Sequence, residues 1–365
     1  MSNYCKHLYD ETTDGYIHLI KINENKTVKI YNTTNAAVKE VVEEFNGESN
    51  VFVTPNTTYK PERGVNNIRQ FRALYIDIDG IEGDQLYVSY KIFELVELEK
   101  IPKPTMIVDS GRGLHVYWRI KNAPYGALYT WQELEDMLYQ NLKEYGADIK
   151  ATDGARVLRL PGTINSKNNQ ECRIIYQDDE LEYSMYDLRE KYLNYKKKKQ
   201  IGKAIKENKK IVTNAFFNSY SLHIARAEDL ETLCRLRNYN MKGYRNMALH
   251  CYAYWIGIYE RDIEVLAKRV NELNNKFREP AKDSEVRAIL RCVPKAIEKF
   301  LDYEQGIRSG QDKRVTKGMR DKGGYWYKNE TLIERFDIIE AEQKHMKTII
   351  GIRVKYDRKN KKRNE

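Results

Sequence analysis

The residues best suited to chemistry are two aspartates in the segment YIDIDG, residues 75–80. On an extended strand, Asp77 and Asp79 project from the same face, with their Cα atoms about 7 Å apart. Two carboxylates held this close repel each other unless a cation lies between them. Because carboxylate oxygens are preferred ligands of Mg²⁺ and Mn²⁺, the pair is a candidate divalent-metal site. The alternative is a strand face that is merely acidic and exposed to solvent.

Two further segments combine glycine or a carboxylate with cationic side chains. In SGRGLH, residues 110–115, two glycines lie beside Ser110, Arg112 and His115, so the backbone can approach a phosphate group closely. A later segment begins with Asp148 and contains three cations suited to phosphate: Arg156, Arg159 and Lys167. A plain glycine hairpin and a charged strand edge are the structural alternatives for these two segments.

Short extended segments must position these residues, because apolar and polar side chains alternate along them. Residues 71–80 fit one strand, and residues 104–120 fit two strands joined by a glycine turn. Residues 131–146 have apolar side chains at helical spacing and end at a glycine, which predicts a helix with a glycine C-cap. Further extended runs follow at 155–165 and 171–177. This mixture predicts an α+β fold built around an antiparallel sheet.

The positive charge of the chain is concentrated in two places. There are 63 Lys and Arg against 53 Asp and Glu, a net charge of +10 over 365 residues. Residues 196–210 carry a net charge of +7 and residues 353–365 one of +5, so the remainder sums to −2. A polyanion such as nucleic acid is the expected partner of both runs. A solubilising linker and a frayed end are the alternative interpretation.

Beyond the first lysine run the pattern becomes helical. Apolar residues recur at helical spacing in four segments: 226–238, 244–258, 260–274 and 283–300. A stretch rich in glycine and charge comes next, and residues 329–350 then fit two short amphipathic helices. The predicted organisation is an α+β domain, a Lys-rich linker, a helical domain, a second linker and a small helical module with a basic tail. Their predicted bounds are 1–192, 193–215, 216–305, 306–327 and 328–365.

Three motifs in a fixed order resemble one family. YIDIDG (75–80), SGRGLHVYW (110–118) and ADIKATDGARVLRLPGTINSK (147–167) are similar to the archaeo-eukaryotic primase superfamily, in its plasmid- and phage-type primase–polymerase branch. GYRNMALH (243–250) resembles the helical domain that follows such cores, and residues 329–365 resemble a small terminal module of mobile-element replication proteins. The resemblance implies a catalytic core with an RRM-like antiparallel sheet, an all-α domain and a C-terminal module of helix-turn-helix type.

The resemblance also implies a role for each candidate residue. Asp77 and Asp79 become catalytic metal ligands, with Asp148 preferred as the third carboxylate and Asp153 as its rival. The residues expected to bind the incoming nucleotide are Ser110, Arg112, His115, Arg159 and Lys167. Two divalent ions, Mg²⁺ or Mn²⁺, would activate the attacking 3′-hydroxyl and stabilise the leaving pyrophosphate. The cationic side chains would offset the charge of the triphosphate.

The implied activity is that of a DNA-directed primase or primase–polymerase. It would make primers from nucleoside triphosphates on single-stranded DNA, in the replication of a plasmid, phage or integrated element. The alternative is an origin-binding initiator whose helix-turn-helix at 329–350 contacts DNA through Gln343, Lys344 and Lys347, with the primase-like domain as a scaffold.

Several other classes lack the residues that they need. No GxxxxGK[ST] loop occurs, so the chain is not a P-loop helicase and we expect a separate replicative helicase as its partner. The six histidines are isolated, whereas a rolling-circle nickase needs two side by side, and the five cysteines form no CxxC pair for a zinc module. No window approaches 18 consecutive apolar residues and no secretion leader is recognisable, so we expect a cytoplasmic protein without a membrane span.

Overall fold

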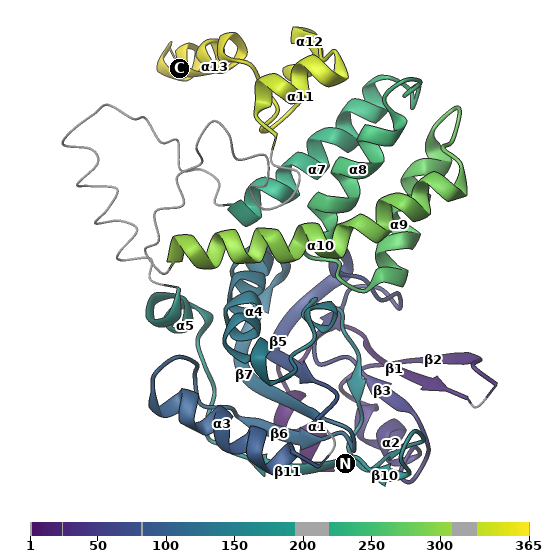
Figure 1. Ribbon diagram of the computed structural model, residues 1–365, viewed down its shortest axis with the longest axis vertical. Coiled ribbons are helices and arrows are strands. Elements are labelled where there is room, and N and C mark those ends of the chain that lie inside the picture. Colours follow the sequence, from purple (N-terminus) through teal and green to yellow (C-terminus); the bar gives the residue numbers. More distant parts are fainter. Residues whose placement is uncertain (1, 24, 82, 194–218, 309–326, 365) are drawn as a thin grey trace. The chain divides into compact units, whose positions relative to one another are not determined.

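The computed structural model describes residues 2–23, 25–81, 83–193, 219–308 and 327–364 (Figure 1). The chain divides into two compact units, Met1–Ile211 and Val212–Glu365. Most of the Lys-rich linker predicted at 193–215 and most of the second linker, predicted at 306–327, lie outside the described residues. The finer division into five segments therefore stays a prediction.

A five-stranded antiparallel sheet forms the centre of the first unit, which confirms the predicted α+β class. The order of its strands is β11-β6-β7-β5-β4. Their bounds are Thr57–Thr58 for β4, Ile68–Ile78 for β5, Met106–Asp109 for β6, Leu114–Pro124 for β7 and Arg173–Gln177 for β11. The predicted strand, glycine turn and strand at 104–120 correspond to β6 and β7. Alternation along β5 buries Leu74, Ile76 and Ile78 completely on one face.

The edge of β5 beyond its short pairing with β4 is protected by α4 and the segment that follows it. In α4, Leu128–Leu142, Glu135 accepts the Tyr75 N–H at 2.8 Å, and the Trp131 indole donates to the Ala73 carbonyl at 2.9 Å. The chain after α4 then pairs with β5, and the Asp79 N–H donates to the Gly146 carbonyl at 3.2 Å. Pairing of this kind removes exposed strand edge, and it fixes where the chain around residue 148 lies.

A second, four-stranded sheet borders the first and has the order β2-β1-β3-β8. Its strands are β1 Ile17–Ile22, β2 Val28–Thr33, β3 Val51–Val53 and β8 Leu158–Arg159. Within the extended run predicted at 155–165, only β8 and β9 are strands. Strand β9, Ile164–Asn165, pairs with β10, Gln170–Glu171. The pairing of Phe52 with Arg159 connects residues far apart in sequence. Short helices complete the unit: α1 Ser2–Leu8, α2 Val38–Glu43, α3 Gln85–Glu97 and α5 Met185–Tyr192.

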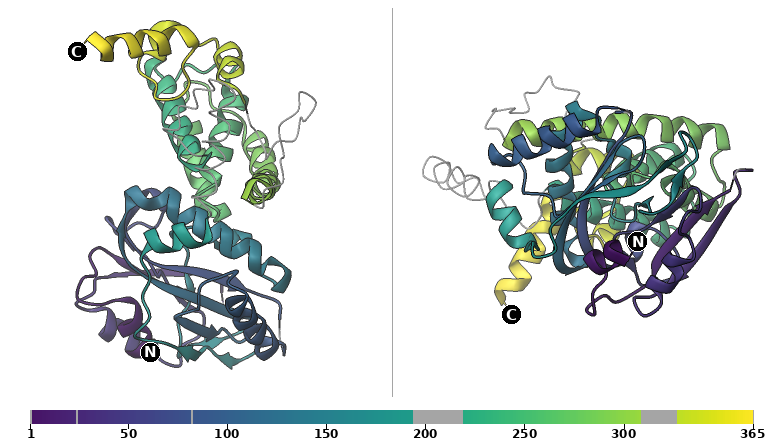
Figure 2. Two further views of the ribbon diagram at one scale, coloured as in Figure 1. Left: turned by 90° about the vertical axis from the view of Figure 1, so that its left-hand side faces the viewer. Right: turned by 90° about the horizontal axis from the view of Figure 1, so that it is seen from below.

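The second unit is helical, as predicted for the region after the lysine run (Figure 2). Its main helices are α7 Ser219–Leu236, α8 Arg245–Gly257, α9 Ile263–Lys276 and α10 Asp283–Arg308. Helix α8 is the central one, because its residues from Ala248 to Gly257 are buried apart from His250. Helix α10 continues to Arg308, past the predicted domain end at 305. In the part of the chain that the structure describes, no helix is long and apolar enough to cross a membrane.

The C-terminal helices pack onto α7 through one buried carboxylate. They are α11 Asn329–Phe336, α12 Glu340–Gln343 and α13 Ile352–Asn364. Asp229 of α7 is 1% exposed and accepts the backbone N–H groups of Lys347, Thr348 and Ile349, at 2.5, 2.6 and 2.9 Å. Arg237 adds an ion pair with Glu342 at 2.7 Å. These contacts make residues 329–350 a packed part of the helical unit.

We expect Asp229→Ala to detach the C-terminal helices. The substitution leaves three buried N–H groups without their acceptor, so the free energy of unfolding should fall by about 3 kcal/mol. Urea unfolding of the full chain measures this loss, and limited proteolysis should release the segment that begins near residue 327. The neighbouring Glu228→Ala, which removes only an exposed ion pair with Lys347, should cost less than about 1 kcal/mol. Equal losses for the two variants would contradict the role given to Asp229.

The structure corrects three expectations for this region. Gln343, expected to contact DNA, is only 5% exposed, and its side chain bonds the Ile338 carbonyl and the Gly351 N–H. The predicted second helix is limited to the four residues of α12. The basic tail is also not a frayed end, because it forms α13, whose Arg358 donates to three carbonyl groups at residues 343, 344 and 346.

Candidate active site

Asp77 lies within a row of side chains that crosses one end of the five-stranded sheet. His115 on β7 is in register with it, with 3.7 Å between His115 Nε2 and Asp77 Oδ1. On the other side Ala147 forms an antiparallel bridge with Ile78, and the Asp148 N–H donates to the Asp77 carbonyl at 2.8 Å. Directly opposed residues of antiparallel strands project from the same face. Asp148, Asp77 and His115 therefore share one face, although they come from three parts of the chain.

Asp79 follows on the same face, and glycines let the backbone pass close to it on both sides. A Cβ atom at Gly113 would lie 1.9 Å from the Ile78 carbonyl oxygen, so the position accepts only glycine without a backbone shift. Gly146 has a φ of +94°, and a Cβ there would lie 2.9 Å from the Asp79 carbonyl oxygen. The second glycine of SGRG thus serves the approach of β7 to β5. The expected contribution of this glycine to phosphate binding stays a prediction.

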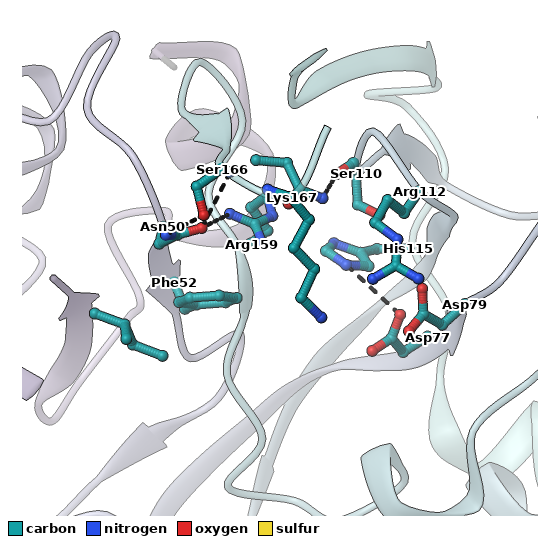
Figure 3. Close-up of a pocket in the computed structure, with 12 residues that line it drawn as sticks. Asn50, Phe52, Asp77, Asp79, Ser110, Arg112, His115, Arg159, Ser166 and Lys167 are labelled. Atoms are coloured by element: carbon teal, nitrogen blue, oxygen red, sulfur yellow. Dashed lines mark hydrogen bonds and ion pairs between the residues drawn. The ribbon is translucent and has the colours of Figure 1, made fainter. Parts of the chain in front are cut away.

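A cavity of about 330 Å³ opens over this face, and Figure 3 shows the residues around it. The residues that line it are Ile22, Asn50, Phe52, Asp77, Asp79, Ser110, Arg112, His115, Arg159, Asn165, Ser166 and Lys167. All five residues predicted to bind the nucleotide are among them, together with the acidic pair. Asp148 borders Asp77 but does not line the cavity. Figure 3 shows Lys167 extending between Arg159 and His115, with Arg112 beside Asp79.

Burial shifts the pKa values of the two neighbours Asp77 and His115 in opposite directions. It raises the pKa of Asp77 to about 7, and the charges of Asp148 and Asp79 act in the same direction, against the opposing effect of nearby arginines. Burial also lowers the pKa of His115 to about 3, and the charges of Arg159 and Arg156 act in the same direction. His115 is therefore neutral at physiological pH, which corrects its expected role as a cation. Within the described residues, its Nδ1 makes no hydrogen bond.

The two candidates for the third carboxylate lie in different surroundings. Asp148 is next to Asp77 and acts on its pKa, while its Oδ1 caps a 3₁₀ turn by accepting the Lys150 N–H at 2.9 Å. Asp153 is 0% exposed, and its carbonyl accepts the Tyr75 hydroxyl at 2.7 Å. This arrangement favours Asp148 over Asp153. The role of Asp148 as a metal ligand stays a prediction.

The chemistry of the acidic pair fits a hard divalent cation. Asp77 and Asp79 offer oxygen ligands from one strand face. Because burial raises the pKa of Asp77, a cation beside its carboxylate would favour the ionised form. Among the residues that the structure describes, no three His, Cys, Asp or Glu side chains already surround one point. The protein thus supplies a pair of carboxylates on a rigid strand, with Asp148 beside it.

The residues missed by the sequence analysis come from β3, the position just before it, and β9. Asn50 has a φ of +54°, and its Oδ1 accepts the Arg159 guanidinium at 3.1 Å, while its Nδ2 donates to Ser166 Oγ at 2.7 Å. The ring of Phe52 lies 4.7 Å below the Arg159 guanidinium, a cation–π contact. Asn165 donates to the Ser110 carbonyl at 2.9 Å. No local pattern marks these residues, because each acts on a partner distant in sequence.

Comparisons with known proteins identify the family of the chain. A family model described as the RepB DNA-primase N-terminal domain matches residues 54–211. A replication protein of Clostridium perfringens is 36% identical over 321 residues, which cover 83% of this chain and 69% of that protein. Among solved structures, the AEP domain of the Cyanophage S-2L primase–polymerase has a TM-score of 0.39 and 19% identity, covering 52% of this chain and 95% of that chain. The primase RepB' has a TM-score of 0.35 and 13% identity, covering 85% and 98%.

The family match and the replication relative confirm the predicted class at its coarser level, a replication protein with a primase-type domain. Within this class, the chain belongs to the replication-protein family that carries the RepB DNA-primase N-terminal domain.

Proposed function

We propose that this protein is a primase that synthesises primers on single-stranded DNA by metal-dependent nucleotidyl transfer. The observation that carries the proposal is the acidic pair Asp77 and Asp79, with Asp148 beside it, at the edge of a cavity lined by Arg112, Arg159 and Lys167. The substrates are nucleoside triphosphates and a DNA template. The setting is the replication of a plasmid, phage or integrated element, as the family suggests.

Bound at the acidic pair, two Mg²⁺ or Mn²⁺ ions would activate a 3′-hydroxyl and stabilise the leaving pyrophosphate. Asp77 and Asp79 hold their carboxylates on one face, with Asp148 as the third ligand. The guanidinium groups of Arg112 and Arg159 and the ammonium group of Lys167 compensate the negative charge of the triphosphate. Because the cavity is partly shielded from water, each of these charges acts more strongly than it would in solution.

The neutral His115 has a different task from that of the cations. A neutral imidazole carries one N–H donor, and it lies between Asp77 and the basic side of the cavity. It can donate a hydrogen bond to a phosphate oxygen while keeping Asp77 free of a competing cation. The Ser110 hydroxyl group, in the turn before β7, adds a further donor beside the glycines.

The direct test is synthesis from labelled nucleotides on unprimed single-stranded DNA with Mg²⁺ or Mn²⁺. The proposal predicts short oligonucleotides whose formation needs the template and the metal ion. No product with either ribo- or deoxynucleotides, under conditions where the protein binds the template, would refute it. Duplex unwinding would need a separate helicase, since the sequence contains no P-loop.

The alternative of an initiator that reads its origin through residues 329–350 loses one of its three expected contacts, because Gln343 is buried. The Lys347 side chain is paired with Glu228 at 2.5 Å. A discrete footprint on an origin, combined with no nucleotide incorporation, would favour this alternative over the primase.

Asn50 should act as a positioning residue for Arg159. Asn50→Gly removes both amide contacts but tolerates the positive φ, so we expect the KM for nucleotide to rise about tenfold while kcat changes little. Asn50→Ala loses the same contacts and adds backbone strain, so its larger loss should include a lower unfolding temperature. Steady-state kinetics and thermal unfolding separate the two effects. Wild-type KM in the glycine variant would show that the amide does not orient Arg159.

The end of α13 should contribute salt-sensitive DNA affinity. Replacement of Lys359, Lys361, Lys362 and Arg363 by glutamine leaves the contacts of Arg358 intact. Each lost phosphate contact should reduce the slope of log affinity against log salt by about 0.7 on a single strand. Titrations at several salt concentrations measure this slope, and synthesis at saturating template should not change. An unchanged slope would show that the tail does not contact DNA.

A further inference from the structure

One face of the four-stranded sheet extends from the cavity to the open edge of β2. Ile30, Ile20, Phe52 and Arg159 lie opposite one another on successive strands, so their side chains share this face. Ile22 and Val28 form the next pair along it. We call the five apolar residues Ile20, Ile22, Val28, Ile30 and Phe52 the hairpin face.

The hairpin face is apolar but poorly covered. Val28 and Ile30 are 55% and 60% exposed and Ile22 is 36% exposed, whereas Ile20 between them is nearly buried. The opposite face of the same sheet behaves differently, because Leu19 and Val53 are completely buried there. The uncovered side is therefore the one that continues into the candidate active site.

We propose that the hairpin face carries the bases of the single-stranded DNA template next to the candidate active site. This inference rests on the proposed function and assigns the template side of that site. The triphosphate end of an incoming nucleotide belongs near Asp79, Arg112 and Lys167, with Arg159 at the border toward the base. Figure 3 shows Phe52 at the opposite side of the cavity from Asp79. The base of the nucleotide then points toward Phe52. Its pairing partner in the template must lie farther out, in the direction of Ile20 and Ile30.

Polar groups suited to a sugar–phosphate backbone border the same region. A second cavity of about 580 Å³ shares Ile22 and Asn50 with the first. It is lined by amide, hydroxyl, backbone and charged groups: Lys21, Asn23, Asn25, Gly47, Glu48 and Ser49. Sequence-tolerant binding of single strands combines aromatic side chains with a cationic groove. Phe52 supplies an aromatic ring here, and Lys21, which pairs with Glu48 at 2.5 Å, supplies a cation in the groove. Because the hairpin face continues into the nucleotide cavity, we assign it to template DNA and not to a protein partner.

The test replaces exposed apolar groups without adding charge. Val28→Thr with Ile30→Thr keeps two β-branched residues in β2, so the strand should persist. We expect the affinity for labelled oligo(dT) to fall about tenfold, because contacts to the bases are lost. The slope of log affinity against log salt should stay unchanged, since no phosphate contact is removed. The KM for the nucleotide should change much less than the KM for the template.

A matched control changes two exposed apolar residues elsewhere in the same unit. Leu98 and Ile175 are 58% and 42% exposed, and Leu98→Thr with Ile175→Thr should bind oligo(dT) like the wild type. Photo-crosslinking with 5-iodouracil in the template should label peptides within residues 17–33 or 50–53 of the wild-type protein. Wild-type affinity in the Val28 and Ile30 variant, or crosslinks confined to other peptides, would overturn the proposal. So would a wild-type dimer that the variant dissociates, because a second copy would then be the occupant.

The outcome is separable from that of the proposed function. If the wild-type protein binds oligo(dT) through residues 17–33 but incorporates no nucleotide, the template assignment holds and the primase proposal fails. If synthesis proceeds normally and the variant binds as tightly as the wild type, the primase proposal holds and the hairpin face has another role.

Discussion

Primer synthesis should fall by at least about a thousandfold when Asp77 and Asp79 are both replaced by asparagine. Metal ions stabilise such a transition state by several kcal/mol, and each loss of about 1.4 kcal/mol lowers the rate tenfold. The two amides keep the size and much of the hydrogen-bonding capacity of the carboxylates. They cannot supply the negative charge that holds a divalent ion. The loss should appear in kcat and should persist at high metal concentration.

The same substitution should not unfold the protein, and the raised pKa of Asp77 gives the reason. A folded-state pKa of about 7, against the ordinary 3.8, means that folding favours the protonated side chain. This favourable contribution is complete below about pH 4 and is lost as the pH rises through about 7. An asparagine side chain resembles the protonated form at every pH. The difference in unfolding temperature between the single variant Asp77→Asn and the wild type should therefore shift in favour of the variant as the pH is raised from 5 to 8.

Two measurements on these variants would contradict the assignment. Template-dependent synthesis close to the wild-type rate in Asp77→Asn with Asp79→Asn would show that the acidic pair is not catalytic. A marked loss of unfolding temperature at pH 8 would show that the carboxylate of Asp77 stabilises the fold, contrary to the effect of its burial.

Gly113→Ala should be the most damaging change outside the acidic pair. A methyl group there would lie 1.9 Å from the Ile78 carbonyl oxygen and 3.1 Å from the Asp79 Cα atom. Both contacts are with backbone, which cannot rotate away as a side chain does. The strands must separate at the position of the catalytic pair. We expect a loss of about 1–3 kcal/mol in stability and a fall in synthesis of about a hundredfold or more, since misplaced catalytic groups are this costly.

Gly126→Ala is the matched control, because no atom of the described residues lies within 4 Å of a Cβ at that position. Its unfolding free energy should stay within about 0.5 kcal/mol of the wild-type value, and its synthesis rate should be unchanged. Thermal unfolding and synthesis assays on both variants decide the matter. Similar behaviour of Gly113→Ala and Gly126→Ala would mean that close contact between β7 and β5 does not support the site.

Local patterns predicted the part of the site that lies on continuous strands. The alternation around Asp77 and the glycine turn before His115 each fall within a few residues of sequence, and the structure has β5, β6 and β7 there. The four main helices of the second unit were predicted for the same reason, because helical periodicity is local. The neutral state of His115 was missed, since burial depends on the whole domain.

Contacts between distant segments could not be predicted from one sequence. The pairing of Phe52 with Arg159 depends on β8, a strand of two residues. The position of Asp148 depends on a single bridge between Ala147 and Ile78. Gln343 resembled an exposed polar residue of a helix, but its side chain is buried and bonds the Ile338 carbonyl and the Gly351 N–H, which lie outside its own helix.

Incorporation of single nucleotides on homopolymer templates is the sharpest test of primase activity at the acidic pair. Oligo(dT) and oligo(dC) would each be incubated with the protein, Mg²⁺ or Mn²⁺ and one labelled nucleotide at a time, in ribo and deoxy form. A primase of the proposed kind incorporates only the complementary base and needs the metal ion, and Asp77→Asn with Asp79→Asn abolishes incorporation; the sugar that is accepted follows from the same data. Incorporation that ignores the template, or that survives the loss of both carboxylates, would rule out metal-dependent primer synthesis at this site.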